Sequence, residues 1–139
     1  MKGVNKNEVQ HLLFVCVENS CRSQLAEAMA RRSLPAGFEV HSAGSQPSGL
    51  INPRAVEVMA ELGYDLAMHQ SKALTEVPDI EYAAVITMGC GDNCPWVRGR
   101  VREDWGLPDP KGLPLEEFRR LRDIIATRVS DLFERLHNN

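Results

Sequence analysis

Short apolar runs alternate with longer stretches of helical periodicity along this chain. Residues 11–16 form an apolar run, residues 38–43 alternate between apolar and polar side chains, and residues 82–88 are apolar almost throughout. These patterns predict three strands, of which the last is buried on both faces. A weaker pattern over residues 97–103 predicts a fourth short strand.

Apolar residues spaced three and four positions apart predict helices between and after these strands. The first helix is expected over residues 20–34. The second begins at Pro53, with Asn52 as its N-cap, and stops at Gly63. A short helical turn is expected over residues 74–77.

The last helix, over residues 115–136, has the clearest apolar stripe. The stripe comprises Phe118, Leu121, Ile125, Val129, Leu132 and Leu136. The arginines outside this stripe are expected to form a plain solvated surface; they are Arg119, Arg120, Arg122 and Arg128. The loops at residues 45–52 and 105–112 are rich in Pro and Gly.

Alternating strands and helices predict a single α/β domain over residues 1–139, with residues 1–8 as a polar tail. The expected architecture is a three-layer open sheet of about four parallel strands with helices on both faces. In such sheets, binding sites form beyond the carboxyl ends of the strands. The residues that follow strands 11–16 and 82–88 should therefore lie at one edge.

The composition is that of an ordinary globular protein. The 139 residues are 43% hydrophobic and 25% charged, and the net charge of −3 argues against nucleic-acid binding. No export signal and no apolar run of membrane length is present, so we expect a cytoplasmic protein that is not bound to a membrane. With no unusually long apolar surface, a monomer is expected. Four cysteines in such a chain suggest chemistry or metal binding rather than a disulfide framework.

The loop after the first strand has the composition of an anion-binding site with a nucleophile. Cys16 and Arg22 enclose it in a C-x5-R spacing, and Ser23 follows. Backbone N–H groups and a helix N-terminus can surround an oxyanion, and the same positive environment favours the thiolate of Cys16. The residues expected to hold the anion are Val17, Glu18, Asn19, Ser20, Cys21 and Arg22. A buried filler cysteine and a solvated arginine are the alternative interpretation, which their combination in one loop disfavours.

Cys90 and Cys94 form a second cysteine pair after the strand at 82–88. On a helical turn their Cα atoms would lie about 6 Å apart, which a disulfide tolerates. A redox-active pair, a zinc site and unrelated buried thiols are all open at this point. Zinc needs two more ligands, from Cys16, Cys21 or His69, and a lone C-x3-C is weak evidence, so we expect no metal site.

Asp109, between two prolines, is either a turn-former or a proton donor on a loop over the site. His69 is expected to be a structural hydrogen-bonding residue, whereas His11, His41 and His137 carry no signal. For Cys21, both an apolar filler and a protective disulfide partner remain open.

Residues 15–28 resemble the active-site loop of arsenate reductases built on the low-molecular-weight protein tyrosine phosphatase fold. Further family landmarks follow in order at residues 41–44, 86–90 and 105–110, and the resemblance covers about residues 10–136.

The resemblance implies that Cys16 attacks arsenate held by the loop amides and Arg22, with Ser23 and Asn19 in support. Asp109 would protonate the departing oxygen.

The resemblance further implies that Cys90 attacks the Cys16–arsenic adduct and releases arsenite. Cys94 would then resolve the Cys16–Cys90 disulfide to a Cys90–Cys94 disulfide. Thioredoxin is the implied reductant, with glutaredoxin or a low-molecular-weight thiol as the alternative, and no cofactor is implied.

Three features depart from the family pattern. Many relatives have Gly in place of Glu18, and a carboxylate there must point away from the anion. Close thioredoxin-linked members space their last two cysteines more widely. Some relatives bind potassium near the segment that contains Gln70 and Lys72, and because a lysine is a poor neighbour for a cation we expect no such site.

The main rival is a phosphatase acting on phosphotyrosine, which needs the same cradle, thiolate and acid. Such relatives usually have aromatic residues after Asp-Pro, where this chain has Lys111 and Gly112. A zinc- or oxyanion-binding regulatory protein is a third, weaker alternative.

Overall fold

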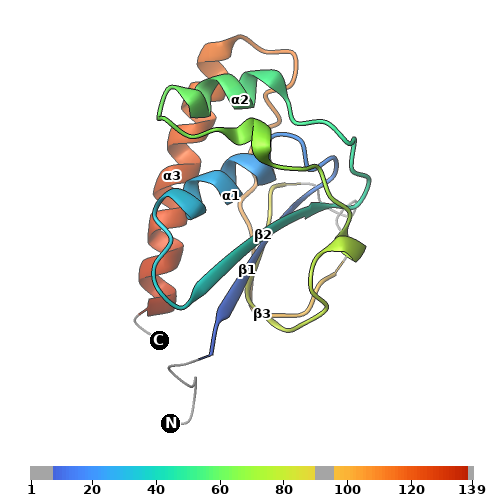
Figure 1. The fold of residues 1–139 in the computed structure, drawn as a ribbon, viewed down its shortest axis with the longest axis vertical. Helices are drawn as coiled ribbons and strands as arrows, with labels where there is room; N and C mark the ends of the chain where they lie inside the picture. The colour runs from blue at the N-terminus through green and yellow to red at the C-terminus, as the bar shows by residue number, and fades with distance from the viewer. Residues whose placement is uncertain (1–7, 90–95, 138–139) are drawn as a thin grey trace.

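The computed structural model describes residues 8–89 and 96–137 of the chain. Four strands form one sheet in the order β2-β1-β3-β4, and every neighbouring pair is parallel (Figure 1). The strands are β1 Gln10–Cys16, β2 Phe38–Gly44, β3 Tyr82–Thr87 and β4 Gly99–Asp104. The predicted parallel α/β sheet is therefore confirmed.

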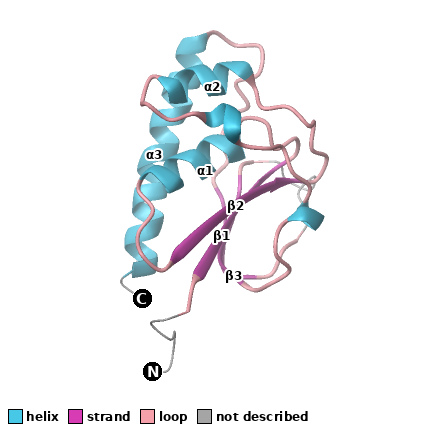
Figure 2. Ribbon diagram, viewed as in Figure 1, coloured by secondary structure: helices cyan, strands magenta, loops and turns pink. Residues whose placement is uncertain are grey.

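The α-helices are α1 Arg22–Arg32, α2 Pro53–Ala60 and α3 Leu115–His137, and two 3-10 turns are η1 Leu66–Met68 and η2 Leu74–Glu76. All three α-helices gather on one side of the sheet (Figures 1 and 2). In the part of the chain that the structure describes, the second face carries only η2 and adjoining loops, whose apolar side chains pack on Leu13, Val15 and Val85. We expected helices on both faces of the sheet, but in the described residues the second face is covered by one 3-10 turn and loops. A cover of this size is sufficient because the apolar cluster on this face is small.

The main core lies between the sheet and the helices. Leu12 and Phe14 of β1 are fully buried with Leu25 of α1. The predicted stripe of α3 is buried along its whole length. Asn52 caps α2 as expected, since its Oδ1 accepts a hydrogen bond from the Arg54 backbone N–H at 2.9 Å.

The expected solvation of the α3 arginines is wrong for Arg122, which is buried. Its guanidinium donates to the Val58 carbonyl at 2.8 Å and to the Glu61 carboxylate at 2.8 Å. The aliphatic part of the side chain is buried, while the guanidinium supplies hydrogen bonds to the carbonyl and carboxylate oxygens. Arg122 therefore links α3 to the end of α2.

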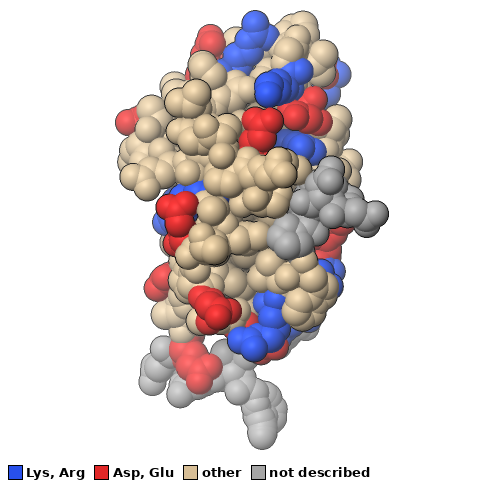
Figure 3. Space-filling view, turned by 90° about the vertical axis from the view of Figure 1, so that its right-hand side faces the viewer, with Lys and Arg blue, Asp and Glu red and all other residues tan. Residues whose placement is uncertain are grey.

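Several boundaries differ from the sequence-based expectation. α1 begins at Arg22 rather than at residue 20, because the loop before it holds Asn19 at φ +50°. β4 begins two residues later than expected, and η1 has no counterpart in the prediction. No helix in the described ranges has the length and apolar character needed to cross a membrane. Figure 3 shows one side of the molecule, where positive and negative side chains intermingle.

Gly44 allows the loop after β1 to lie directly against the end of β2. A Cβ at this position would be 2.4 Å from the Val17 carbonyl oxygen and 3.0 Å from the Asn19 nitrogen. Both are backbone atoms, which cannot rotate away as a flexible side chain could. The absence of a side chain at Gly44 therefore determines how closely the loop approaches the sheet.

We predict that Gly44→Ala lowers the free energy of unfolding by about 1–3 kcal/mol and weakens inorganic phosphate binding, because the loop must shift. Urea unfolding and a phosphate titration measure the two effects. Gly63→Ala is the matched control: its φ is +80° but nothing lies within 4 Å of the added Cβ. It should cost about 1 kcal/mol and leave phosphate binding unchanged. Equal effects of both substitutions on phosphate binding would contradict this role of Gly44.

Candidate active site

A small cavity of about 140 Å³ lies beyond the carboxyl end of β1. Its lining comprises Cys16, Val17, Glu18, Ser20, Cys21, Arg22, Asn52, Asp109 and Lys111. The structure thus brings Asp109 to the loop at residues 16–22, from which it is remote in sequence. The cavity suits a tetrahedral oxyanion better than a large substrate.

The Cys16 sulfur is buried and lies 2.8 Å from the Ser23 hydroxyl oxygen. That same oxygen accepts a hydrogen bond from the Asn19 Nδ2 at 2.8 Å. Because Asn19 can only donate there, the hydroxyl proton of Ser23 is free to point at the sulfur. The Ser23 hydroxyl can therefore donate a hydrogen bond to the Cys16 sulfur. Ser23 is not among the residues that line the cavity.

Asn19 holds the loop in shape from below. Its side chain is fully buried, and its Oδ1 accepts from the Gln24 side-chain amide and from the Lys72 backbone N–H, both at 2.8 Å. These two donors identify the oxygen end of the Asn19 amide and direct Nδ2 toward Ser23. Of the residues expected to bind the anion, Asn19 is therefore the one whose side chain does not line the cavity.

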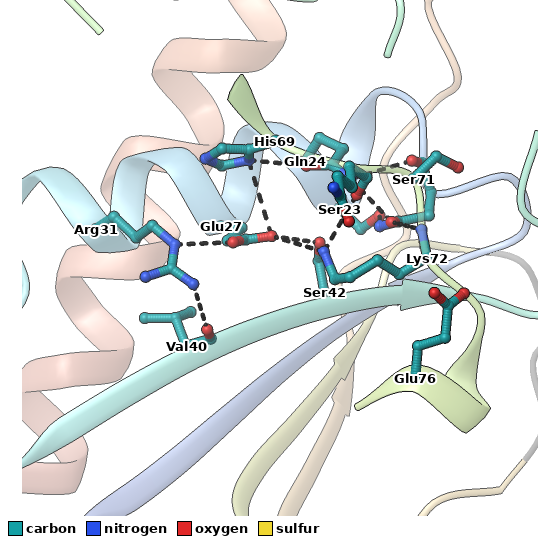
Figure 4. Close-up of polar contacts among 12 residues, drawn as sticks. Ser23, Gln24, Glu27, Arg31, Val40, Ser42, His69, Ser71, Lys72 and Glu76 are labelled. Atoms are coloured by element: carbon teal, nitrogen blue, oxygen red, sulfur yellow. Dashed lines mark hydrogen bonds and ion pairs between the residues drawn. The ribbon is translucent and has the colours of Figure 1, made fainter. Parts of the chain in front are cut away.

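The network continues from Gln24 to a buried histidine. Gln24 Oε1 lies 2.9 Å from His69 Nδ1, and His69 Nε2 lies 2.6 Å from the Tyr64 hydroxyl (Figure 4 shows His69 and Gln24). An amide oxygen only accepts, so Nδ1 carries the hydrogen and Nε2 accepts from Tyr64. Burial lowers the pKa of His69, which agrees with a neutral ring. The expected structural role of His69 fits this geometry.

Glu27 is a buried carboxylate on α1 with four polar neighbours (Figure 4). Ser42 donates to it at 2.5 Å and Arg31 at 2.8 Å, while the Lys72 amino group lies 3.7 Å away. Burial alone would raise the pKa of Glu27, but the Ser42 hydrogen bond and the charge of Lys72 outweigh it, and the pKa lies below its usual value. Arg31 and Lys72 both place positive charge beside this carboxylate. The absence of a potassium site stays a prediction.

Arg22 joins three loops at the cavity. Its Nη1 donates to the carbonyl oxygens of Met88 and Leu107, each at 2.9 Å. Its Nη2 lies 4.0 Å from Oδ2 of Asp109. Arg22 also lines the cavity, so the donors that these carbonyls leave free can bind an oxyanion there.

Glu18 and Lys111 form an ion pair across the mouth of the cavity. The Lys111 amino group lies 3.4 Å from Oε2 of Glu18, and both side chains are largely exposed. The carboxylate that sequence analysis identified as a problem for anion binding is thus held by a cation. Both residues line the cavity. Sequence reasoning had considered Lys111 only as the place of a missing aromatic residue.

Cys21 lines the cavity but differs chemically from Cys16. Burial, together with the nearby charge of Asp109, raises its pKa to about 12, so it stays a thiol at neutral pH. Of the cysteines that the structure describes, Cys16 and Cys21 are both free thiols.

Cys90 and Cys94 lie outside the described residues. Gly89, which precedes Cys90 in the sequence, packs against the loop that contains Asp109: its added Cβ would lie 3.2 Å from the backbone of Gly106 and of Leu107. Gln24, which is fully buried, was missed by sequence reasoning. The usable signal is a polar residue four positions before Ala28, on the apolar face of the helix.

Comparison with known proteins agrees with this geometry. The model of the family described as low molecular weight phosphotyrosine protein phosphatase matches residues 11–139. An arsenate reductase of Staphylococcus aureus (strain Newman) is 38% identical over 128 residues, covering 89% of this chain and 96% of the relative.

Two solved structures share the fold. A structure described as an arsenate reductase in the phosphate binding state is 37% identical with a TM-score of 0.83, covering 92% of this chain and 99% of its own. A thioredoxin-dependent arsenate reductase of Corynebacterium glutamicum is 32% identical with a TM-score of 0.76, covering 94% of this chain and 63% of its own.

The neutral His69 predicts a pH-dependent stability. Its pKa is lower in the folded than in the unfolded protein, so unfolded chains take up the proton first as the pH falls. The free energy of unfolding should therefore be highest above about pH 6.5 and should decrease as the pH falls below that value. Urea unfolding between pH 7.5 and 5.5 measures this decline.

In the same experiment, His69→Gln should make the decline shallower, although His41, whose pKa burial also lowers, retains part of it. His137→Gln, at the exposed end of α3, is the matched control and should keep the full decline. An unchanged pH dependence in His69→Gln would contradict the assignment of a neutral, buried ring.

Proposed function

The chain belongs to the low molecular weight phosphotyrosine protein phosphatase family, and we propose that within it the protein reduces arsenate to arsenite. The observation that carries this proposal is the small oxyanion cavity with the Cys16 sulfur in its wall and Arg22 and Asp109 at its side. The relatives described as arsenate reductases align with nearly the whole chain.

In the first chemical step, the Cys16 thiolate attacks arsenic while the loop amides and Arg22 hold the remaining oxygens. A sulfur–arsenic bond forms and an arsenic–oxygen bond breaks. Asp109 supplies a proton, and the leaving oxygen departs as water. The Ser23 hydroxyl at 2.8 Å lowers the cost of holding the negative sulfur before attack.

In the second step, Cys90 attacks the Cys16 sulfur. A disulfide forms, the sulfur–arsenic bond breaks, and its electron pair goes to arsenic, which leaves as arsenite; two thiols are oxidised as arsenic gains two electrons. The position of Gly89 beside the Asp109 loop supports Cys90 in this role.

In the third step, Cys94 attacks Cys90, which frees Cys16 and leaves a Cys90–Cys94 disulfide. Cys21, with a pKa of about 12, stays protonated and takes no part.

Thioredoxin is the proposed reductant of this disulfide, supported by the thioredoxin-dependent structural relative. Glutaredoxin or a low-molecular-weight thiol is the alternative. Because the cycle needs reduced thiols, we place the protein in the cytoplasm, where such thiols are maintained, and we propose that it acts as a monomer.

The same cavity could host phosphate-ester hydrolysis, and the family description includes phosphotyrosine phosphatases. The Glu18–Lys111 pair at the mouth disfavours a phenyl ring there. Hydrolysis also has no use for Cys90 and Cys94.

A single-turnover experiment tests the relay. Fully reduced protein mixed with arsenate and no reductant should release about one arsenite per chain, with a Cys90–Cys94 disulfide found by peptide mapping. Cys16→Ser should release none. Cys94→Ser should still release arsenite but stop at a Cys16–Cys90 disulfide.

Cys21→Ser removes a thiol that the proposed relay does not use but keeps the backbone N–H of the loop, so it should still release about one arsenite per chain and form the Cys90–Cys94 disulfide. Four intact thiols and no arsenite would overturn the relay, and turnover of p-nitrophenyl phosphate without thiol loss would favour the phosphatase. Adding thioredoxin, and separately glutaredoxin with glutathione, identifies the reductant by which one permits repeated turnover.

A second prediction concerns the ion pair at the cavity mouth. Lys111→Ala leaves the Glu18 carboxylate unpaired beside an anionic substrate, so the KM for arsenate should rise about threefold to fivefold at low salt with little change in kcat. Adding Glu18→Gln to that variant should restore the KM. Arg120→Ala, which removes an equally exposed cation on α3, is the charge-matched control. A KM unaffected by Lys111→Ala would show that the pair does not act on the substrate.

A further inference from the structure

Three potential metal ligands converge on the second face of the sheet, away from the cavity at its carboxyl edge. They are His11 near the start of β1 and Glu39 and His41 on β2. One ligand atom from each lies within 4.8 Å of the other two. None of them lines the oxyanion cavity or takes part in the proposed chemistry.

The register of two parallel strands produces this cluster. His11 pairs directly with Glu39, and His41 is two residues further along β2, opposite Leu13. Side chains two apart on a strand share a face, so the pairing puts all three side chains on the same side (Figure 1 shows β1 beside β2). Glu39 and His41 are two positions apart on β2, and His11 lies across from them on β1. Together they can surround one ion from three directions.

The distances suit a first-row transition metal. His11 Nδ1 lies 3.0 Å from His41 Nε2 and 3.7 Å from Glu39 Oε1. Two ligand atoms on a tetrahedral zinc ion, each at about 2.0–2.1 Å, are about 3.4 Å apart. A hydrogen bond joins the two facing nitrogens at 3.0 Å, and the ring planes are 17° apart. The ion would replace this hydrogen bond, which requires the two rings to turn until both lone pairs converge on it.

We propose that His11, Glu39 and His41 bind one divalent transition-metal ion of the zinc class. Two imidazoles and one carboxylate match the ligand preferences of Zn²⁺, and three protein ligands leave a fourth position for water. Both facing nitrogens then present lone pairs to the ion, and each ring carries its hydrogen on its other nitrogen.

The surroundings of the three ligands allow an ion to enter from solvent and restrict the rotation of the His41 ring. The side chain of Glu39 is 55% exposed and that of His11 is 23% exposed, so an ion can reach the cluster from solvent. The ring of His41 packs edge-on against Tyr82, with ring centroids 6.0 Å apart, and this contact limits its rotation. Bound zinc would join β1 to the edge strand β2.

Nuclear magnetic resonance of the untagged, reduced, ¹⁵N-labelled protein tests the proposal. Zinc chloride is added to two equivalents, because the cysteine thiols compete for the ion. The imidazole ¹⁵N signals of His11 and His41 should shift, while those of His69 and His137 serve as internal controls. Signals of His11 and His41 that remain unshifted while zinc occupies thiols alone would overturn the site.

Isothermal titration with zinc gives an independent measure. Glu39→Gln, an isosteric change at an exposed position, should weaken this binding event at least about tenfold, and His41→Ala should abolish it. His137→Gln should leave it unchanged. Equal zinc stoichiometry and affinity in all four proteins would refute the proposal. The result does not depend on arsenate reduction, so the two proposals can fail separately.

Discussion

The buried side-chain amide of Asn19 maintains the geometry of the active-site loop. Its residue adopts a left-handed backbone at φ +50°, which costs free energy for any residue but glycine. Hydrogen bonds from Gln24 and the Lys72 backbone to the amide oxygen offset that cost and leave the nitrogen end for Ser23. Without this fixed orientation, the Ser23 hydroxyl proton would have no preferred direction. The orientation of the Ser23 hydroxyl beside Cys16 thus depends on a residue that does not line the cavity.

The fold could be predicted from sequence because its elements follow simple periodicities. The buried strand β3 and the striped helix α3 occur close to where their patterns indicated. The exceptions arise from long-range contacts. Arg122 has the local signature of a surface residue, but the neighbouring helix supplies Val58 and Glu61 as partners that no local pattern reveals. η1 is too short to show a period.

The candidate site was predictable where chemistry is concentrated in one segment. Cys16, Arg22 and Ser23 are close in the chain, so their spacing alone indicated a cradle. Asp109 was a candidate because the displacement of an oxygen needs a proton donor. The Glu18–Lys111 pair and the His11–His41 contact are different, since each joins residues separated by tens of positions. Their meeting depends on strand register and loop path. Charge and side-chain type identify these two contacts only once the fold is known.

The shared nitrogen of Arg22 has a consequence for how affinity and redox state are related. Nη1 donates to the carbonyls of Met88 and Leu107, and Met88 is only two residues before Cys90. In the proposed relay, a displacement of Met88 when Cys90 forms a bond would shift a carbonyl group to which Arg22 donates. By thermodynamic reciprocity, an anion that orders Arg22 would also favour the observed position of the Met88 carbonyl. In the proposed cycle, Arg22 would couple release of the oxyanion to formation of the disulfide.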